Sequence, residues 1–124
     1  MTINSPSPQR GEIWLVNFNP TIGAEIRKVR RAVVVSSDAI GRLPIKLVAP
    51  ITEWKPYFLN NIWHVRINPD TTNSLTKASA VDALQLRGVD TQRFVRKLGQ
   101  LSATTMEEIT IAIAAVIEYR EPSN

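Results

Sequence analysis

Short runs of β-branched and aromatic residues, separated by turn formers, recur along most of the chain. The first three runs, at residues 12–18, 32–37 and 45–49, are flanked by Asn, Asp, Gly and Pro, which predicts three strands in succession. A turn is expected at residues 38–42, between the second and third strands. Pro44 suits the beginning of the third strand, because a proline there removes no hydrogen bond from the sheet interior.

The second half of the chain continues this alternation of strands and loops. An aromatic loop is expected at residues 54–61, and the composition of residues 68–74 is also that of a loop. The strands predicted in this half cover residues 62–67, 79–86 and 95–101, with a turn at residues 87–90 and a helical turn at residues 91–93 between the last two.

The last part of the chain has the periodic apolar pattern of a helix. Thr104 with Glu107, or Thr105 with Glu108, has the spacing of a capping box, and the glutamates suit the positive beginning of a helix. The predicted helix covers residues 102–119, and one of its faces carries Met106, Ile109, Ile113, Val116 and Ile117. About six short strands and one terminal helix predict a mainly β (α+β) fold, a small barrel with the helix packed on it.

The chain length of 124 residues is that of one domain. We expect this domain to cover residues 10–120, after a disordered lead-in at residues 1–9 and before a short tail at residues 121–124. No apolar stretch is long enough to cross a membrane, and the first residues lack the pattern of a signal peptide, so a cytoplasmic protein is expected. The chain has no cysteine and one histidine, His64, so neither a protein metal site nor a cofactor is expected.

The most strongly charged segment lies between the first two predicted strands. Residues 23–31 (GAEIRKVRR) hold four cations against one carboxylate, and the whole chain has a formal net charge of +4. This balance favours a nucleic acid, an anionic surface or an acidic partner, although charge alone does not choose among them. Cationic side chains on a loop between two stiff strands are a common arrangement for a binding site.

Three pieces of the sequence resemble one known family in their order and spacing. They are RGEIWLVNFNPTIGAEIRKVRRAVVVSSDAI at residues 10–40, APIT at residues 49–52 and SAVDALQLRGVDTQRFVRKLGQL at residues 79–101. From residue 10 to residue 119 the chain is similar to the MazF/PemK (Kid) family of toxin endoribonucleases from type II toxin–antitoxin modules. The resemblance implies a CcdB/PemK-like fold with an SH3-like barrel, a homodimer, and metal-independent cleavage of single-stranded RNA at short sequences. It also implies a cognate MazE-like antitoxin, whose acidic and apolar tail would lie in the cationic groove.

The resemblance places the catalytic residues at Arg30 and Thr52, at the beginning of the second strand and the end of the third. Metal-free cleavage uses the ribose 2′-hydroxyl as nucleophile, so the protein must remove a proton and stabilise charge on the phosphoryl group. Arg30 would clamp the phosphate, and Thr52 would donate a hydrogen bond to it. Glu25, which matches the glutamate of the family's GSE motif, is the candidate base or the group that orients the arginine, because an arginine holds its proton too tightly to act as a base. The expected products end in a 2′,3′-cyclic phosphate and a 5′-hydroxyl.

Departures from the family pattern leave some roles open. The family's GSEQ is GAEI in this chain. Arg31 stands where the family has a proline, so the clamp is ambiguous by one position, although the register with the following valines favours Arg30. Leu84 stands where Kid-like members have an aspartate, and the nearest acid is Asp82, so the general acid and the general base are not assigned.

Further contacts to RNA are expected from the cationic loop, the aromatic loop and the end of the fifth predicted strand with the turn after it. The residues concerned are Arg27, Lys28, Arg31, Trp54, Lys55, Gln85 and Arg87. Trp54 and Tyr57 could stack on bases, or cover the mouth of the barrel or a dimer interface. His64 is either a base or, as we favour, a strand residue with a partner.

Two other functional classes remain open at this stage. A DNA gyrase poison like CcdB shares the fold but acts through its C-terminal residues, and the ending EYREPSN lacks the apolar Trp-Gly-Ile tail expected there. A catalytically inactive, RNA-binding homologue is the other class, and the altered cationic loop is its only support. RNA cleavage separates this second class from the toxin.

Overall fold

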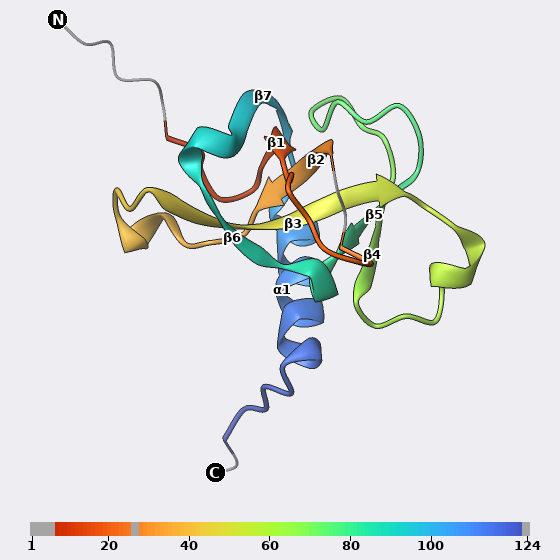
Figure 1. Cartoon of the computed structure of the whole chain (residues 1–124). Helices are drawn as coiled ribbons and strands as arrows, with labels where there is room; N and C mark the ends of the chain where they lie inside the picture. The colour runs from red at the N-terminus through yellow and green to blue at the C-terminus, as the bar shows by residue number, and fades with distance from the viewer. Residues whose placement is uncertain (1–6, 26–27, 123–124) are drawn as a thin grey trace, which may run out of the picture.

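Antiparallel strands that curve around a shared core dominate the computed structural model, which describes residues 7–25 and 28–122. Within these residues, the sheet has seven strands in the order β4-β5-β3-β2-β1-β7, and β6 pairs with β3. One helix, α1, lies beneath the sheet and runs away from it toward the C-terminus (Figure 1). The bounds are β1 Glu12–Asn17, β2 Val29–Val34, β3 Ile45–Glu53, β4 His64–Ile67, β5 Ser79–Asp82, β6 Arg87–Asp90, β7 Phe94–Gln100 and α1 Ala103–Val116.

The long strand β3 connects the sheet by pairing with three other strands. Residues 45–48 pair with β6, residues 48–50 with β2, and residues 51–53 with β5. Val48 is paired with β2 and with β6, so these two strands lie on opposite edges of β3, and β5 follows β6 along the same edge. The pairing of β3 therefore changes on both edges close to Pro50.

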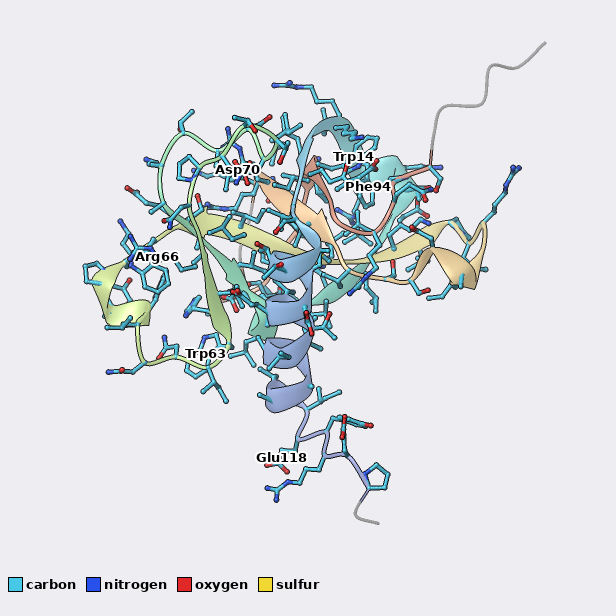
Figure 2. All side chains as sticks on the ribbon, turned by 180° about the vertical axis from the view of Figure 1, so that it is seen from behind. Trp14, Trp63, Arg66, Asp70, Phe94 and Glu118 are labelled. Atoms are coloured by element: carbon cyan, nitrogen blue, oxygen red, sulfur yellow. The ribbon has the colours of Figure 1, made fainter. Side chains whose placement is uncertain are left out.

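Alternation along the strands builds one hydrophobic cluster on each face of the sheet, because successive side chains of a strand point to opposite faces. The larger cluster packs against α1 and includes Ile13, Val33, Ala49, Ile51, Met106 and Ile109. The smaller cluster consists of Val16, Phe18, Ala32, Val34, Val48 and Val89, with Trp14 and Phe94 packed edge to face beside it (Figure 2). Neighbouring residues of β1, β2 and β3 thus alternate between the two clusters.

The helix α1 begins and ends at different residues from those predicted. Its N-cap is Ser102, whose hydroxyl accepts a hydrogen bond from the backbone N–H of Thr105 at 3.1 Å, so both predicted capping boxes are wrong. Met106 and Ile109 are buried, as the apolar pattern predicts. Ile117 is not part of the buried face, because the helix ends at Val116 and the Ile117 side chain is 68% exposed.

Several predicted strand boundaries also differ: the strand predicted at residues 32–37 is β2 at Val29–Val34, and the one predicted at residues 62–67 begins only at His64. Two further differences lie in the second half of the sheet. The turn predicted at residues 87–90 is the strand β6, which pairs with the first half of β3. The strand predicted at residues 79–86 ends at Asp82, because the Asp82 carboxylate accepts hydrogen bonds from the N–H groups of Leu84 and Gln85 and begins a short 3-10 turn. The predicted helical turn at residues 91–93 is confirmed as a 3-10 turn.

The two ends of the chain are only partly described. Residues 1–6 of the predicted lead-in and residues 123–124 of the predicted tail lie outside the described residues. Pro8 is buried, and the backbone N–H of Gln9 donates to the Glu12 carboxylate at 2.8 Å. Ordered contacts thus already begin at Pro8 and Gln9, within the predicted lead-in. In the described part of the chain, no helix is long and apolar enough to cross a membrane.

Packing of α1 against the sheet is expected to supply a large share of the stability. Ile109 is completely buried, so replacing it with alanine should lower the free energy of unfolding by about 2 to 5 kcal/mol. Ile111 lies on the same helix and is 63% exposed, and Ile111→Ala should change that free energy by no more than about 0.5 kcal/mol. Urea unfolding followed by circular dichroism measures both, and equal losses in the two variants would contradict this packing.

Candidate active site

A cavity opens where β2 and β3 separate. The hydrogen-bonded register of these strands covers only residues 32–34 of β2 and 48–50 of β3, whereas β2 stays paired with β1 as far as Val29. The first residues of β2 and the last residues of β3 therefore line a gap instead of a ladder. This first cavity has a volume of about 390 Å³, and its wall includes Arg30, Arg31, Thr52, Glu53, Lys55 and Lys77.

The register places Arg30 and Thr52 on the same face of the sheet. Ala32 is paired with Pro50, and both residues face the smaller hydrophobic cluster. Side chains two residues apart on a strand point to the same face. Arg30 comes two residues before Ala32 on β2, and Thr52 comes two residues after Pro50 on β3, so both lie on this face. Arg31 shares its face with Val33, on the side of the larger cluster. The geometry thus brings Arg30, and not Arg31, opposite Thr52.

Glu25 lines a second cavity, of about 490 Å³, whose wall includes Pro50. The Glu25 carboxylate accepts a hydrogen bond from the N–H of Ile22 at 2.6 Å, and the Glu25 N–H donates to the Ile22 carbonyl at 3.2 Å, so a tight turn orients the carboxylate. The base of the loop is closed by Lys28, whose N–H donates to the side chain of Asn19 at 3.0 Å. Arg27, predicted to bind RNA, lies outside the described residues.

Gln85 and Arg87 join Glu25 in the wall of the second cavity. The Gln85 side-chain amide donates to the Asp82 carboxylate at 3.3 Å, and the Arg87 guanidinium lies 5.6 Å from the centre of the Phe18 ring. Phe18 and Pro50 form the apolar part of the wall. The second cavity therefore combines apolar surface with an amide, a carboxylate and a guanidinium, which suits a planar base more than a metal ion.

The predicted RNA-binding residues are divided between the two cavities. Arg31 and Lys55 line the first cavity, Gln85 and Arg87 line the second, and Lys28 and Trp54 line neither. The Trp54 ring lies 5.1 Å from the guanidinium of Arg66 and packs edge to face on Phe58, beside the aromatic loop seen near Arg66 in Figure 2. Tyr57 is 74% exposed on the same loop.

Glu53 and Lys77 were not recognised in the sequence. Glu53 follows Thr52 directly and lies between Lys55 and Lys77, each at 3.4 Å from one of its carboxylate oxygens. Lys77 reaches the first cavity because β5 pairs with the last three residues of β3, which brings the preceding loop close. Glu53 could have been found from the sequence, because it directly follows the APIT motif at residues 49–52. Lys77 could not, because only the pairing of β3 with β5 brings it to the cavity.

His64 lies in a buried polar cluster that lines neither cavity. Its ring stacks on Phe58 with ring centres 3.8 Å apart, its Nδ1 lies 3.1 Å from the side-chain nitrogen of Asn61, and its Nε2 lies 3.7 Å from Asp82. Burial lowers the pKa of His64 below its usual value, and the nearby Asp82 carboxylate opposes this shift. These contacts favour the strand residue with a partner over the catalytic base.

Comparison with known proteins identifies the family. A model of the PemK-like, MazF-like toxins of type II toxin–antitoxin systems matches residues 9–117. The endoribonuclease MazF9 of Mycobacterium tuberculosis is 31% identical over 115 residues, which cover 85% of this chain and 92% of that protein. The chain therefore belongs to the PemK-like, MazF-like family of type II toxin–antitoxin toxins.

Solved structures share the fold. The crystal structure of MazF from Deinococcus radiodurans has a TM-score of 0.76 at 22% identity and covers 92% of this chain and 99% of its own. A mycobacterial endoribonuclease in complex with its cognate antitoxin has a TM-score of 0.72 at 18% identity, with 93% and 99% of the two chains covered. The predicted mainly β, CcdB/PemK-like fold is thus confirmed, with seven strands in the described residues in place of about six.

The described residues of the site do not form a metal centre. Among the described residues, no group of three or more His, Cys, Asp or Glu side chains is arranged to hold an ion. In the wall of the first cavity, as far as the structure describes it, four cations stand against one carboxylate, and cations suit phosphate oxygens as ligands.

The pKa of His64 can be followed directly, because it is the single histidine of the chain. We expect a nuclear magnetic resonance titration of its ring protons to have a midpoint below 6.5, since burial disfavours the imidazolium. Asp82→Asn should lower the midpoint further, because the Asp82 carboxylate favours the imidazolium and asparagine keeps an oxygen for the turn. A midpoint above 6.5, or a rise in Asp82→Asn, would contradict this environment.

The lowered pKa of His64 also determines how the stability of the fold changes with pH. Below about 6.5 the unfolded chain takes up a proton at His64 before the folded protein does, so this group destabilises the fold as the pH falls. His64→Gln should therefore lose less stability than the wild type between neutral and mildly acidic pH.

Proposed function

We propose that this endoribonuclease toxin cuts single-stranded RNA through attack of a ribose 2′-hydroxyl on the adjacent phosphorus, without a metal ion or cofactor. The products carry a 2′,3′-cyclic phosphate and a 5′-hydroxyl. One observation carries the proposal: Arg30 and Thr52 share one face of the sheet across the opening between β2 and β3. A phosphate in this opening can contact both side chains at once.

Arg30 stabilises the negative charge that grows on the phosphoryl oxygens during attack. A guanidinium presents paired N–H donors to two oxygens of one phosphate and stays protonated throughout, so its role is electrostatic. Thr52 donates its hydroxyl hydrogen to one of these oxygens. Donors that are already fixed before the reaction stabilise the transition state most, and the neighbouring ladders of β2 with β1 and of β3 with β5 fix the backbone here.

Glu25 is the proposed base, or the group that orients the attacking hydroxyl or Arg30. Its carboxylate is held by the Ile22 N–H and lies in the cavity next to Pro50, two residues from Thr52 along β3. A chain of RNA that crosses from the second cavity to Thr52 passes this carboxylate.

RNA binding is assigned to the charged and aromatic residues around these groups. The proposed contacts are Arg27, Lys28, Arg31, Trp54, Lys55, Gln85 and Arg87. Unstacked bases are recognised by stacking and by hydrogen bonds to their edges, and the second cavity offers both through Phe18 and Gln85. We assign this activity to a single domain covering residues 10–120 and working in the cytoplasm. A MazE-like antitoxin would inhibit it by laying an acidic segment in the same groove.

A homodimer is proposed from an exposed apolar surface. Ile40 and Leu43 lie on the connection between β2 and β3, Ile45 and Leu47 lie at the beginning of β3, and the four side chains are 55%, 54%, 50% and 40% exposed. Gly88 of β6 lies opposite Leu47 and adds no side chain over it. Apolar residues gathered on one surface in this way are typical of a protein interface.

A gyrase poison remains the alternative of a different class. The fold would accommodate it, but such a protein has no need of Arg30 and Thr52 across a cavity. A catalytically inactive, RNA-binding homologue would bind RNA without cutting it.

Cleavage in the presence of EDTA tests the proposed chemistry. Purified protein should cut a long single-stranded RNA at discrete sites and leave cyclic phosphate ends. Arg30→Ala and Thr52→Ala should each lower the cleavage rate by about 100- to 1,000-fold, because each removes a donor to the transition state. Arg31→Ala removes the same charge from a proposed RNA contact but leaves the clamp in place, so it should weaken RNA binding and retain most of the cleavage rate at saturating protein concentration. Loss of activity in Arg31→Ala but not in Arg30→Ala would assign the clamp to Arg31, and no cleavage at all would favour the binding or gyrase alternatives.

Light scattering during gel filtration tests the dimer. We expect twice the chain mass for the wild type and a monomer for Leu47→Glu, since a carboxylate in an apolar interface has no partner. Leu59→Glu is the control, because Leu59 is 74% exposed on the loop after β3, at the opposite end of the molecule from the connection between β2 and β3 (Figure 1). A dimer that survives Leu47→Glu would show that another surface forms it.

A further inference from the structure

Three ionised side chains in the wall of the first cavity have no part in the cleavage chemistry. The ammonium of Lys55 lies 3.4 Å from Oε2 of Glu53, and the ammonium of Lys77 lies 3.4 Å from Oε1. Lys55 contributes most to holding the pKa of Glu53 below its usual range, and Lys77 contributes next. The carboxylate is thus ionised and bridges two cations, each through its own oxygen.

This bridge lies next to the catalytic pair. Glu53 follows Thr52 in β3, so the two side chains point to opposite faces of the strand. Arg30, Thr52, Lys55 and Lys77 nevertheless line one continuous cavity, because β2 has already separated from β3 at this position. A strand of RNA whose phosphate is held by Arg30 and Thr52 therefore continues past the two lysines.

We propose that Lys55 and Lys77 form a subsite for the phosphate next to the one that is cut, and that Glu53 holds both ammoniums in its place until RNA binds. This proposal rests on the proposed function, which identifies RNA as the polyanion that occupies the subsite. It goes beyond that function by adding Lys77 and by giving Glu53 a role.

The chemistry of the two anions supports this exchange. A phosphodiester has one negative charge and two non-bridging oxygens, so it can bridge two ammoniums in the same way as the Glu53 carboxylate. Glu53 is about half exposed, with 47% of its side chain accessible, and can turn away into solvent. The bridge keeps the flexible lysine side chains close together before RNA arrives, which reduces the entropy that binding costs.

Charge and position favour RNA over an acidic protein segment as the occupant. The cavity wall carries Arg30, Arg31, Lys55 and Lys77 against the single carboxylate of Glu53 among the described lining residues. This excess is sufficient for more than one phosphate. The catalytic pair in the same cavity also requires RNA to pass through it.

Salt-dependent binding of an RNA that cannot be cut tests the subsite. The probe is a fully 2′-O-methylated single-stranded RNA, which keeps the phosphates and lacks the nucleophile, and its fluorescence anisotropy gives Kd over a series of salt concentrations. Lys77→Ala should raise Kd by about 3- to 10-fold and reduce the slope of log K against log salt by about 0.7, the value for one lost phosphate contact on a single strand. Lys55→Ala should do the same, and Glu53→Gln should lower Kd because the competing carboxylate is gone.

The matched control is Lys97→Ala. Lys97 is also about half exposed and paired, with its ammonium 2.9 Å from Glu12, but it lies on β7 and lines neither cavity. Lys97→Ala removes the same charge as Lys77→Ala, and it should leave the slope of log K against log salt unchanged. Thermal unfolding of each variant shows whether the fold is retained.

Each outcome has a defined meaning. An unchanged slope in Lys77→Ala, while Arg30→Ala weakens binding, overturns the subsite and leaves the cleavage proposal standing. A reduced slope, together with no cleavage of unmodified RNA by the wild type, supports the subsite and overturns the cleavage proposal. If Lys77→Ala binds RNA normally but loses binding to polyglutamate, the subsite belongs to an acidic protein partner. Weaker RNA binding by Glu53→Gln overturns the exchange of Glu53 for phosphate.

Discussion

The changes of hydrogen-bond partner along β3 are the constraint on which the rest of the structure depends. On one edge, β6 is replaced by β5, and on the other edge, β2 leaves after residue 50. A sheet that kept one partner on each edge would have no opening here. Both cavities lie at these changes, with Pro50 in the wall of one and Thr52 in the wall of the other. The site is therefore a product of strand pairing, and the loops only add groups to it.

The alternation of side chains along each strand then places neighbouring charged residues on opposite faces of the sheet. Arg30 and Arg31 are adjacent in sequence, yet β2 stays paired with β1 through both and turns them to opposite faces. Arg30 lies opposite Thr52 in the continued register, and Arg31 lies on the face of Glu53. The same alternation separates Thr52 from Glu53 on β3. Under the proposed function, the face with Arg30 and Thr52 holds the phosphate that is cut, and Glu53, on the other face, holds the two lysines proposed for the phosphate that follows.

Much of the fold could be predicted from the sequence, because the strands with β-branched runs, such as residues 32–35, have a strong periodic pattern. β6 could not, since Arg87, Gly88 and Asp90 resemble a turn and only pairing with β3 makes them a strand. The resemblance to the family pointed to Arg30, Thr52 and Glu25, but the register was needed to separate Arg30 from Arg31. Lys77 was missed because it comes from a loop whose position depends entirely on the β3–β5 pairing.

The central claim is that Arg30 and Thr52 act on one phosphate. A double-mutant cycle tests it most directly, with single-turnover cleavage rates for wild type, Arg30→Ala, Thr52→Ala and the double variant in EDTA. If both side chains contact the same phosphate, the double variant should be little slower than the slower single variant, because the second donor loses its effect once the phosphate is no longer held. Rate losses that multiply independently would contradict the account and place the two residues on different steps or different phosphates.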